Sequence, residues 1–319
     1  MLKRKLIRKI MVASCALFAL LLLYLIPDNE NKLNIEENLE YVKPEIVTNS
    51  IFLLDDYNYL AKTEVVINSE NIEEKIKELL NILITGGQLE NRVPNGFRSI
   101  LPSETKILSV KYENGLAKIN FSKDLLDIDI SLEEKMIEAI IYTVTTIEEV
   151  DKIIIYVEGD ILTQLPKSKI ILPTTLDRNF GINKIYDFTK TKDITQVTIY
   201  YLKEHNEDYY YVPVTKYLND NRDKIKIIID ELTSYNTYNT NLISYLDSNT
   251  ELLAIEEQLD ILELTFNNYI FSGVDDKEIL EEVIYTICLS IKDNYDVNEI
   301  VIKNDEQEDF LKFVLKEIK

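Results

Sequence analysis

Few residues of this chain have the type and spacing that chemistry requires. The single histidine, His205, stands in the polar segment 203–207, without the nucleophile and orienting acid that a general base needs. We therefore interpret His205 as a solvated residue in a turn. Cys288 lies in an apolar helical segment, which favours a buried and unreactive thiol. Ser122 begins no nucleophile elbow, and neither a G-x-S-x-G sequence nor a P-loop occurs.

Carboxylates are abundant, so a calcium site and a glycosidase pair both have to be considered. The densest pairs are Asp55-Asp56 and Asp275-Asp276, and neither stands in the alternating oxygen-ligand pattern of an EF-hand loop. Asp275 fits better as the N-cap of a helix, where negative charge is favourable. Catalytic carboxylates of glycosidases have no spacing signature in a sequence. The sequence therefore predicts no catalytic residue, no metal and no cofactor.

The composition excludes several further classes of function. The 319 residues include 35 Lys and Arg against 56 Asp and Glu, with a formal net charge of −21. Neutralising nucleic-acid phosphates requires an excess of clustered cations, so nucleic-acid binding is excluded. Two cysteines and one histidine are too few for a disulfide framework or for the usual zinc sites. An apolar fraction of 46% indicates a folded chain, and its length indicates more than one domain.

The N-terminus has the pattern of an export signal. Five cations come first, at Lys3, Arg4, Lys5, Arg8 and Lys9, and residues 10–27 then carry no charge. About 17 apolar residues are the short limit for spanning a bilayer, so residues 1–27 are either a signal anchor or a signal peptide. The basic flank stays in the cytoplasm, which places the rest outside. Without these cations, residues 28–319 carry 30 basic and 56 acidic residues, a formal charge of −26.

Three fates of this segment remain open. Residues 24–28 lack the small side chains of a signal peptidase site, which favours an uncleaved anchor. The sequence Val12-Ala-Ser-Cys15 resembles a bacterial lipobox, with Cys15 as the lipidated residue, but the apolar run continues beyond it. Full secretion is the third alternative. In every case the bulk of the chain is extracytoplasmic, and in the first two it is tethered to the cell membrane.

The exported part contains the same order of elements twice. After a polar spacer at residues 28–50, the alternation of apolar residues predicts strands at 51–54, 64–67, 107–112, 116–121 and 152–157. Two helices lie between them: one is capped by Ser69 and ended by Gly86-Gly87, and the other begins with a capping box at Ser131 and Glu134. The second copy has strands at 197–202, 209–214, 251–256, 261–266 and 299–303. Its helices carry the apolar residues of 225–232 and 279–287, and the latter opens at Asp275 and Glu278.

The repeat is also visible at the level of single residues. Residues 103–110 align with 248–255 at an offset of 145, and Ile140-Ile-Tyr-Thr-Val144 aligns with Val283-Ile-Tyr-Thr-Ile287. This period is too long for a solenoid, so it indicates tandem domains. We expect domains at 51–160 and 196–304, a connector at 161–195 and an amphipathic helix at 305–319.

Each repeat mixes two hairpins, two helices and a further strand. Because each helix carries one apolar face, we expect each to cover one side of a mixed sheet. The fold class predicted is α+β, with two tandem α/β sandwich units after the N-terminal anchor.

Tyrosines are the other unusual feature. The chain has 20 Tyr and no Trp, and five of the tyrosines fall on one predicted hairpin: Tyr200, Tyr201, Tyr209, Tyr210 and Tyr211. Alternate rings of a strand point to opposite faces, so some should enter the core while others remain outside. Two interpretations stand side by side: ordinary strand composition, or an interaction surface, since tyrosine is enriched at interfaces.

The repeats resemble the GerM-domain family of sporulation and spore-germination proteins. The segments that carry the resemblance are 197–202 with 211–214, 100–110 with 114–122, and the strand that leads into Val157-Glu-Gly159. The resemblance covers residues 51–303 in two copies. It implies units similar to ring-building modules, in a membrane-tethered protein that helps to link mother cell and forespore. The second copy departs from the pattern, because it lacks counterparts of Gly86-Gly87 and Gly115.

We therefore expect a non-enzymatic structural protein of a sporulation envelope complex. Its expected partners are other sporulation envelope proteins, with a homo-oligomer as a further option, and the membrane through its N-terminus. The alternative is a module that binds cell wall or assists a wall hydrolase, with peptidoglycan as the partner. A hydrolase with unrecognised carboxylates is the third hypothesis.

Overall fold

The computed structural model describes residues 2–24, 48–205, 208–234, 241–271, 279–305, 310–315 and 318. The chain divides into two compact units, Met1–Glu45 and Ile46–Lys319. Each is described here by itself.

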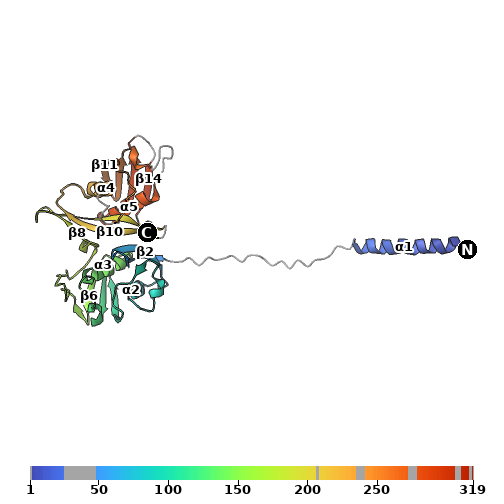
Figure 1. Ribbon diagram of the computed structural model, residues 1–319, viewed down its shortest axis with the longest axis horizontal. Coiled ribbons are helices and arrows are strands. Elements are labelled where there is room, and N and C mark those ends of the chain that lie inside the picture. Colours follow the sequence, from blue (N-terminus) through green and yellow to red (C-terminus); the bar gives the residue numbers. More distant parts are fainter. Residues whose placement is uncertain are drawn as a thin grey trace. The chain divides into compact units, whose positions relative to one another are not determined.

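The first unit contains one helix, α1 (Leu2–Tyr24), coloured blue in Figure 1. Cys15, the residue of the predicted lipobox, is exposed on this helix. Across the described residues, none of the helices combines the length and the hydropathy required to cross a membrane. The predicted anchor and spacer remain predictions.

The second unit contains the two predicted repeats. The first repeat consists of β1 (Thr48–Asp55), β2 (Leu60–Val66), α2 (Ile72–Ile82), β3 (Phe97–Arg98), β4 (Ile107–Glu113), β5 (Leu116–Phe121), α3 (Glu133–Val144), β6 (Lys152–Val157) and β7 (Asp160–Ile161). The second consists of β9 (Thr195–His205), β10 (Asp208–Leu218), α4 (Lys224–Thr233), β11 (Leu252–Gln258), β12 (Ile261–Phe266), α5 (Glu281–Lys292), β13 (Glu299–Asn304) and β14 (Phe310–Val314). Between them lies β8 (Ile185–Asp187), and short 3-10 helices occur at Glu90–Arg92, Lys123–Leu126, Arg178–Phe180 and Asn268–Ile270.

Each repeat has a mixed outer sheet, as the sequence predicted. Strands β4-β5-β6-β7 pair in the order antiparallel, parallel, antiparallel, and strands β11-β12-β13-β14 pair in the same way. The fold is therefore α+β with tandem units. The predicted C-terminal helix at 305–319 is wrong, because Phe310–Val314 is the strand β14, which pairs with β13 along its length.

A third sheet joins the two repeats. Its order is β3-β1-β2-β10-β8, and β9 pairs with β10, so the first hairpins of both repeats lie in one sheet (Figure 1). Between β2 and β10 the backbone pairing is limited to Lys62 opposite Tyr211. Strand β8, from the predicted connector, runs parallel to β10 at Lys216–Leu218. The connector is thus part of the shared sheet.

Helix α3 lies deeper than the sequence predicted. In the first repeat α3 packs on β1 of the shared sheet and on β6 of the outer sheet, as Figure 1 shows. It is therefore buried on nearly all sides, including Glu133 and Glu138, whereas one apolar face was expected. In the second repeat α5 and α4 both pack on β9.

The helix starts also differ from the predicted ones. Asn71, not Ser69, caps α2, because its side chain accepts hydrogen bonds from the first turn. The helix ends at Ile82, ahead of the predicted stop at Gly86-Gly87. No side chain caps α3, since Ser131 bonds to Asp129 instead. The predicted opening of the last helix at Asp275 and Glu278 lies outside the described residues, and α5 begins at Glu281.

Helix side chains bond to the backbone of β1 and β9 in the shared sheet. Thr143 of α3 accepts a hydrogen bond from the Phe52 backbone N–H of β1 at 3.1 Å. Ser290 of α5 accepts one from the Tyr200 N–H of β9 at 2.9 Å. Unpaired strand edges invite further strand pairing, and each of these bonds occupies one backbone N–H that could take part in it. The interior itself consists of two apolar clusters, one for each repeat.

Candidate functional site at the junction of the two repeats

The first polar cluster at the junction joins β1 to β9. Lys203 Nζ lies 2.8 Å from Asp55 Oδ2, and the two side chains are only 3% and 1% exposed. Tyr210 donates its hydroxyl to the same carboxylate oxygen at 2.9 Å. The backbone N–H groups of Tyr57 and Tyr59 both donate to Asp55 Oδ1 at 2.8 Å. Burial, followed by the bond to Asp55, raises the pKa of Tyr210, so its hydroxyl remains a donor.

The second cluster fills the gap where β2 and β10 hardly pair. Asn183 accepts a bond from Leu60 N at 3.0 Å and donates to Leu60 O and to Pro213 O, each at 2.8 Å. A proline has no N–H, so its carbonyl is the group that Asn183 can bind there. The Asn183 N–H in turn donates to the buried carboxylate of Glu138 at 2.9 Å. This one residue therefore connects both hairpins to α3.

Glu138 is the buried carboxylate of this second cluster, and burial opposes its ionisation. Lys184 Nζ is 3.8 Å from its Oε1 and closer, at 2.7 Å, to Glu134. Burial raises the pKa of Glu138 to about 7 in spite of the attraction of Lys184. Lys135 completes the cluster by donating to Asn183 Oδ1 at 3.0 Å.

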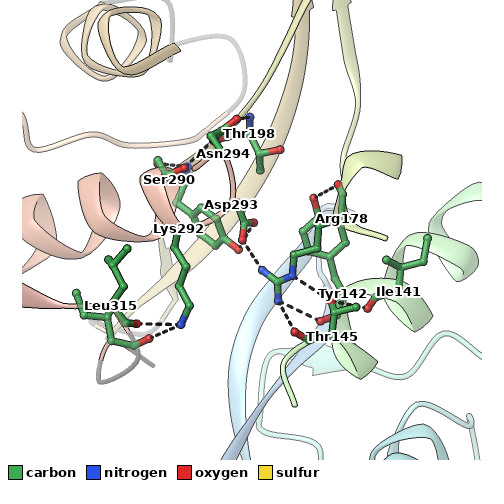
Figure 2. Close-up of polar contacts among 12 residues, drawn as sticks. Ile141, Tyr142, Thr145, Arg178, Thr198, Ser290, Lys292, Asp293, Asn294 and Leu315 are labelled. Carbon is green, nitrogen blue, oxygen red and sulfur yellow. Dashed lines mark hydrogen bonds and ion pairs between the residues drawn. The ribbon is translucent and has the colours of Figure 1, made fainter. Parts of the chain in front are cut away.

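The third cluster joins the connector to α5 (Figure 2). The guanidinium of Arg178 forms an ion pair with Asp293, and the Asp293 side chain is 2% exposed. Arg178 Nε also donates to Thr145 Oγ1 at 3.0 Å, while Tyr142 donates its hydroxyl to the Arg178 carbonyl at 3.1 Å. Tyr200 donates to Asp293 Oδ2 at 2.8 Å. Burial lowers the pKa of Arg178, but the neighbouring Asp293 outweighs it and holds that pKa above its ordinary value.

Two lysines lie close to this third cluster. Lys292 donates to the Leu315 and Ile318 carbonyls at 3.0 and 3.3 Å, and so holds the C-terminal segment against α5. Lys62 on β2 is 3.5 Å from Glu64, and burial lowers its pKa to about 8. Lys62 is thus paired with an acid, and Lys292 is bonded to backbone carbonyls.

The three clusters have the chemistry of a structural joint. Each places oppositely charged side chains of different sequence regions within 4 Å of each other. Removing one partner of a buried ion pair leaves the other charge uncompensated, so each pair favours the arrangement that keeps its partners together. Among the residues that the structure describes, no group of three or more His, Cys, Asp and Glu side chains could hold a metal ion.

The five tyrosines of the predicted interaction surface separate into three groups. Tyr200 and Tyr201 are buried, which removes them from that surface, because α5 and α4 cover β9. Tyr210 and Tyr211 are half-buried, and Tyr211 stacks on Tyr285 with ring centroids 5.8 Å apart. Tyr209 is 41% exposed. Its role in binding stays a prediction.

Cys288 and His205, the other residues considered for chemistry, are buried and half-buried. Cys288 is buried on α5, and burial raises the pKa of its thiol to about 12, as its apolar setting suggested. His205 was expected in a turn, but it is the last residue of β9 and half-buried. Its ring lies so close to Gly96 that a Cβ at that position would come within 2.5 Å of Nε2. The ring therefore packs against the other repeat.

A groove of about 610 Å³ opens beside the first cluster. Its described lining is mostly polar and comes from both repeats: Tyr57, Lys203, Glu204, Leu232, Thr233, Ser234, residues 241–244, Leu246, Asp247 and Ser248. The Tyr57 ring is largely exposed and covers Lys203 Nζ, which lies 3.5 Å from the ring centroid.

Comparisons with known proteins agree with this architecture. A family model described as "Germane: Sporulation and spore germination" matches residues 50–163 and 198–308. The spore germination protein GerM of Bacillus subtilis (strain 168) is 28% identical over 265 residues, which cover 81% of this chain and 71% of that protein.

Among solved structures, the tandem GerMN domains of the sporulation protein GerM from Bacillus subtilis are similar, with a TM-score of 0.74. The sequences are 26% identical, and the match covers 82% of this chain and 92% of that one. The two repeats thus correspond to a pair of domains that a related protein also carries in tandem.

Proposed function

This chain belongs to the Germane family of sporulation and spore germination proteins, and we propose that it is a non-enzymatic structural component of a sporulation envelope assembly. In this role it is tethered to the cell membrane by its N-terminal segment, with the two repeats on the extracytoplasmic side. Its partners are other envelope proteins of the sporulating cell, with further copies of this chain as an option.

The joint between the repeats is the observation that carries the proposal. A sheet common to both repeats and three buried polar clusters hold two domains in one fixed orientation. A scaffold needs such fixed geometry, because each domain then presents its surface at a defined angle to neighbours. The ionisable groups of the joint are engaged with one another, which leaves them unsuited to proton transfer or nucleophilic attack on a substrate.

The basic N-terminal segment and the acidic remainder support the tether. Five cations precede an uncharged stretch, and this arrangement favours retention of the N-terminus in the cytoplasm. Whether Cys15 carries a lipid or the segment stays uncleaved is decided by the intact mass of the membrane-bound protein.

The proposal is tested in the spore-forming cell. We expect deletion of the gene to lower the yield of heat-resistant or germinating spores, and the wild-type chain to restore it. A chain with Asp55→Ala and Asp293→Ala, which cuts two clusters of the joint, should restore it poorly at equal protein level. The matched control is Asp230→Ala, which breaks only an exposed pair with Arg222. Normal sporulation and germination after deletion would overturn the proposal.

A second candidate function is cell-wall binding, and the groove beside Tyr57 favours it. An exposed tyrosine ring next to hydroxyl and carboxylate side chains is a composition that suits a sugar. Retention of the purified full chain on isolated peptidoglycan, and loss of retention in Tyr57→Ala, would support this candidate. Absence of retention would remove it, and release of wall fragments would instead indicate a hydrolase.

A further inference from the structure

The two repeats differ in what covers the first strand of their outer sheets. In the first repeat the strand is β4, and α2 packs on it. The hairpin of β4 and β5 closes with Glu113 opposite Leu116. Backbone N–H groups along an antiparallel strand point alternately toward the partner strand and away from it, so that of Tyr112, one residue before Glu113, points away from β5. That N–H donates to the Glu73 side chain of α2 at 3.0 Å. The outward N–H of Tyr112 is therefore bonded within the chain.

The corresponding strand of the second repeat, β11, has no such cover among the described residues. Its hairpin closes with Gln258 opposite Ile261, so the backbone groups of Glu257 and Ile255 point away from β12. In the described part of the chain no hydrogen bond to these outward N–H groups is found. The helix that corresponds to α2 is α4, and it packs on β9 and α5 instead. Exposed strand edges of this kind pair readily with another strand.

An exposed and strained leucine stands at the end of this edge. Leu259 has φ +56° and is 95% exposed. The same turn in the first repeat uses Asn114 and Gly115, residue types that tolerate positive φ. A bulky side chain at positive φ is unfavourable, and at 95% exposure Leu259 is hardly covered by the residues that the structure describes. Leu253, on β11 itself, is also exposed. An apolar partner outside the chain would give both leucines contacts.

The charge around this edge selects the kind of partner. Four acidic residues lie on β11 or beside its ends, at Glu251, Glu256, Glu257 and Asp260, and none of them has an ion pair within the described residues. Glu256 even stands opposite another acid, Glu263. A second copy of the chain would bring the same acids and a net charge of −21. A strand with lysine or arginine side chains complements the edge instead.

We propose that the outer edge of β11 is a docking site for an extended, basic segment of a partner protein. The segment adds to the outer sheet as a fifth strand beside β11, bonded to the backbone of Ile255 and Glu257. Its basic side chains lie beside the acids on one face of β11, since Glu256 and Glu257 point to opposite faces, and its apolar side chains contact Leu253 and Leu259. This inference rests on the proposed role in an assembly and specifies the surface and the partner chemistry for it.

The test measures binding of a labelled peptide of alternating valine and lysine to the full-length chain by fluorescence anisotropy. We expect saturable binding that weakens with added salt. A valine–glutamate peptide, and a valine–lysine peptide interrupted by proline, should not bind, because one lacks the charge and the other lacks N–H groups. Binding of the glutamate peptide with equal affinity would overturn the proposal.

Variants of β11 distinguish the contribution of its backbone to peptide binding from the contribution of its charge. Glu257→Pro removes an N–H that points outward, so the sheet ladder is kept, and it should weaken binding about tenfold. Glu257→Gln should reduce the salt dependence, and Leu259→Asn should weaken binding without a loss of stability. The matched control is Glu113→Gln, at the equivalent end of the covered strand β4, and it should bind as the wild type does.

The alternatives give distinct outcomes. Unchanged binding in both Glu257→Pro and Leu259→Asn would refute the proposed edge, and Leu259→Asn decides the matter alone if the proline variant does not fold. Self-association of the full chain that Glu257→Pro abolishes would assign the edge to a second copy and overturn the basic partner. The peptide assay is independent of spore yield, so failure of this inference is distinguishable from failure of the proposed scaffold role.

Discussion

Asp293→Ala is the most informative perturbation of the joint. The change removes the carboxylate that pairs with Arg178 and that accepts the Tyr200 hydroxyl, and both partners stay in place. Loss of one member of a buried ion pair costs about 3–5 kcal/mol. The Arg178 side chain is 25% exposed and keeps its bond to Thr145, so we take the lower limit, about 3 kcal/mol. The orphaned tyrosine hydroxyl adds about 1 kcal/mol.

The free energy of unfolding is measured by urea titration of the full-length chain. The 20 tyrosines and the absence of tryptophan make tyrosine fluorescence a suitable probe, with circular dichroism as the second. We expect a loss of about 4 kcal/mol for Asp293→Ala. We also expect the single transition of the wild type to separate into two, because the repeats lose part of their coupling. The double variant with Arg178→Ala should recover part of the loss, since no charge is then left without a partner.

The control is Asp230→Ala, which removes a similar ion pair from an exposed site. Asp230 and Arg222 are 56% and 53% exposed, and such pairs contribute less than about 1 kcal/mol. If Asp293→Ala costs no more than this control, or if the double variant is as unstable as the single one, the third cluster does not hold the repeats together.

Three further predictions concern single side chains. The folded pKa of Glu138, about 7, lies above its ordinary 4.5, so this residue favours folding below pH 4.5 and that contribution is lost as the pH rises through 7. The stability of the wild type relative to Glu138→Gln should therefore fall by about 2.5 kcal/mol between pH 5 and pH 8, and parallel pH profiles would contradict this. Thr143→Val leaves the Phe52 N–H of β1 without an acceptor and should cost about 1–3 kcal/mol in urea unfolding, with no effect if water replaces the hydroxyl. Leu259→Asn places a residue that tolerates positive φ and should raise the free energy of unfolding by about 1 kcal/mol. Asn114→Leu in the first repeat should lower it by a similar amount. If both variants changed the free energy of unfolding in the same direction, strain at these positions would not be the cause.

Local patterns in the sequence were sufficient to predict the two repeats and their mixed outer sheets. The hairpins carry alternating apolar residues, and the Asn114-Gly115 turn has the positive φ values that its residue types suggested. The C-terminal segment was predicted as a helix because its apolar residues fit a helical spacing. Short apolar segments fit both periods, and pairing with β13 decides for a strand.

The joint itself could not be predicted. Asp55 and Lys203 are 148 residues apart, and each follows an apolar run that gives no indication of its partner. Arg178 lies in a connector without periodic pattern, so nothing local distinguishes it from an exposed arginine. Burial of both Tyr200 and Tyr201 has a related reason. Alternation predicts one buried face of β9, but α4 and α5 both pack on this strand and both rings are buried.

The side chain of Asn183 has a consequence for how such chains diverge. It bridges Leu60 of the first repeat and Pro213 of the second, at the place where their strands exchange hardly any backbone bonds. The atoms that make these contacts thus come from regions that lie far apart in the sequence. The partners of this bridge are backbone atoms, and the two carbonyls that accept from Asn183 are present in every residue type, so the bridge depends on the side chain at position 183. A chain in which one repeat is exchanged for that of a relative should therefore keep the bridge only where the segment between the repeats keeps Asn183.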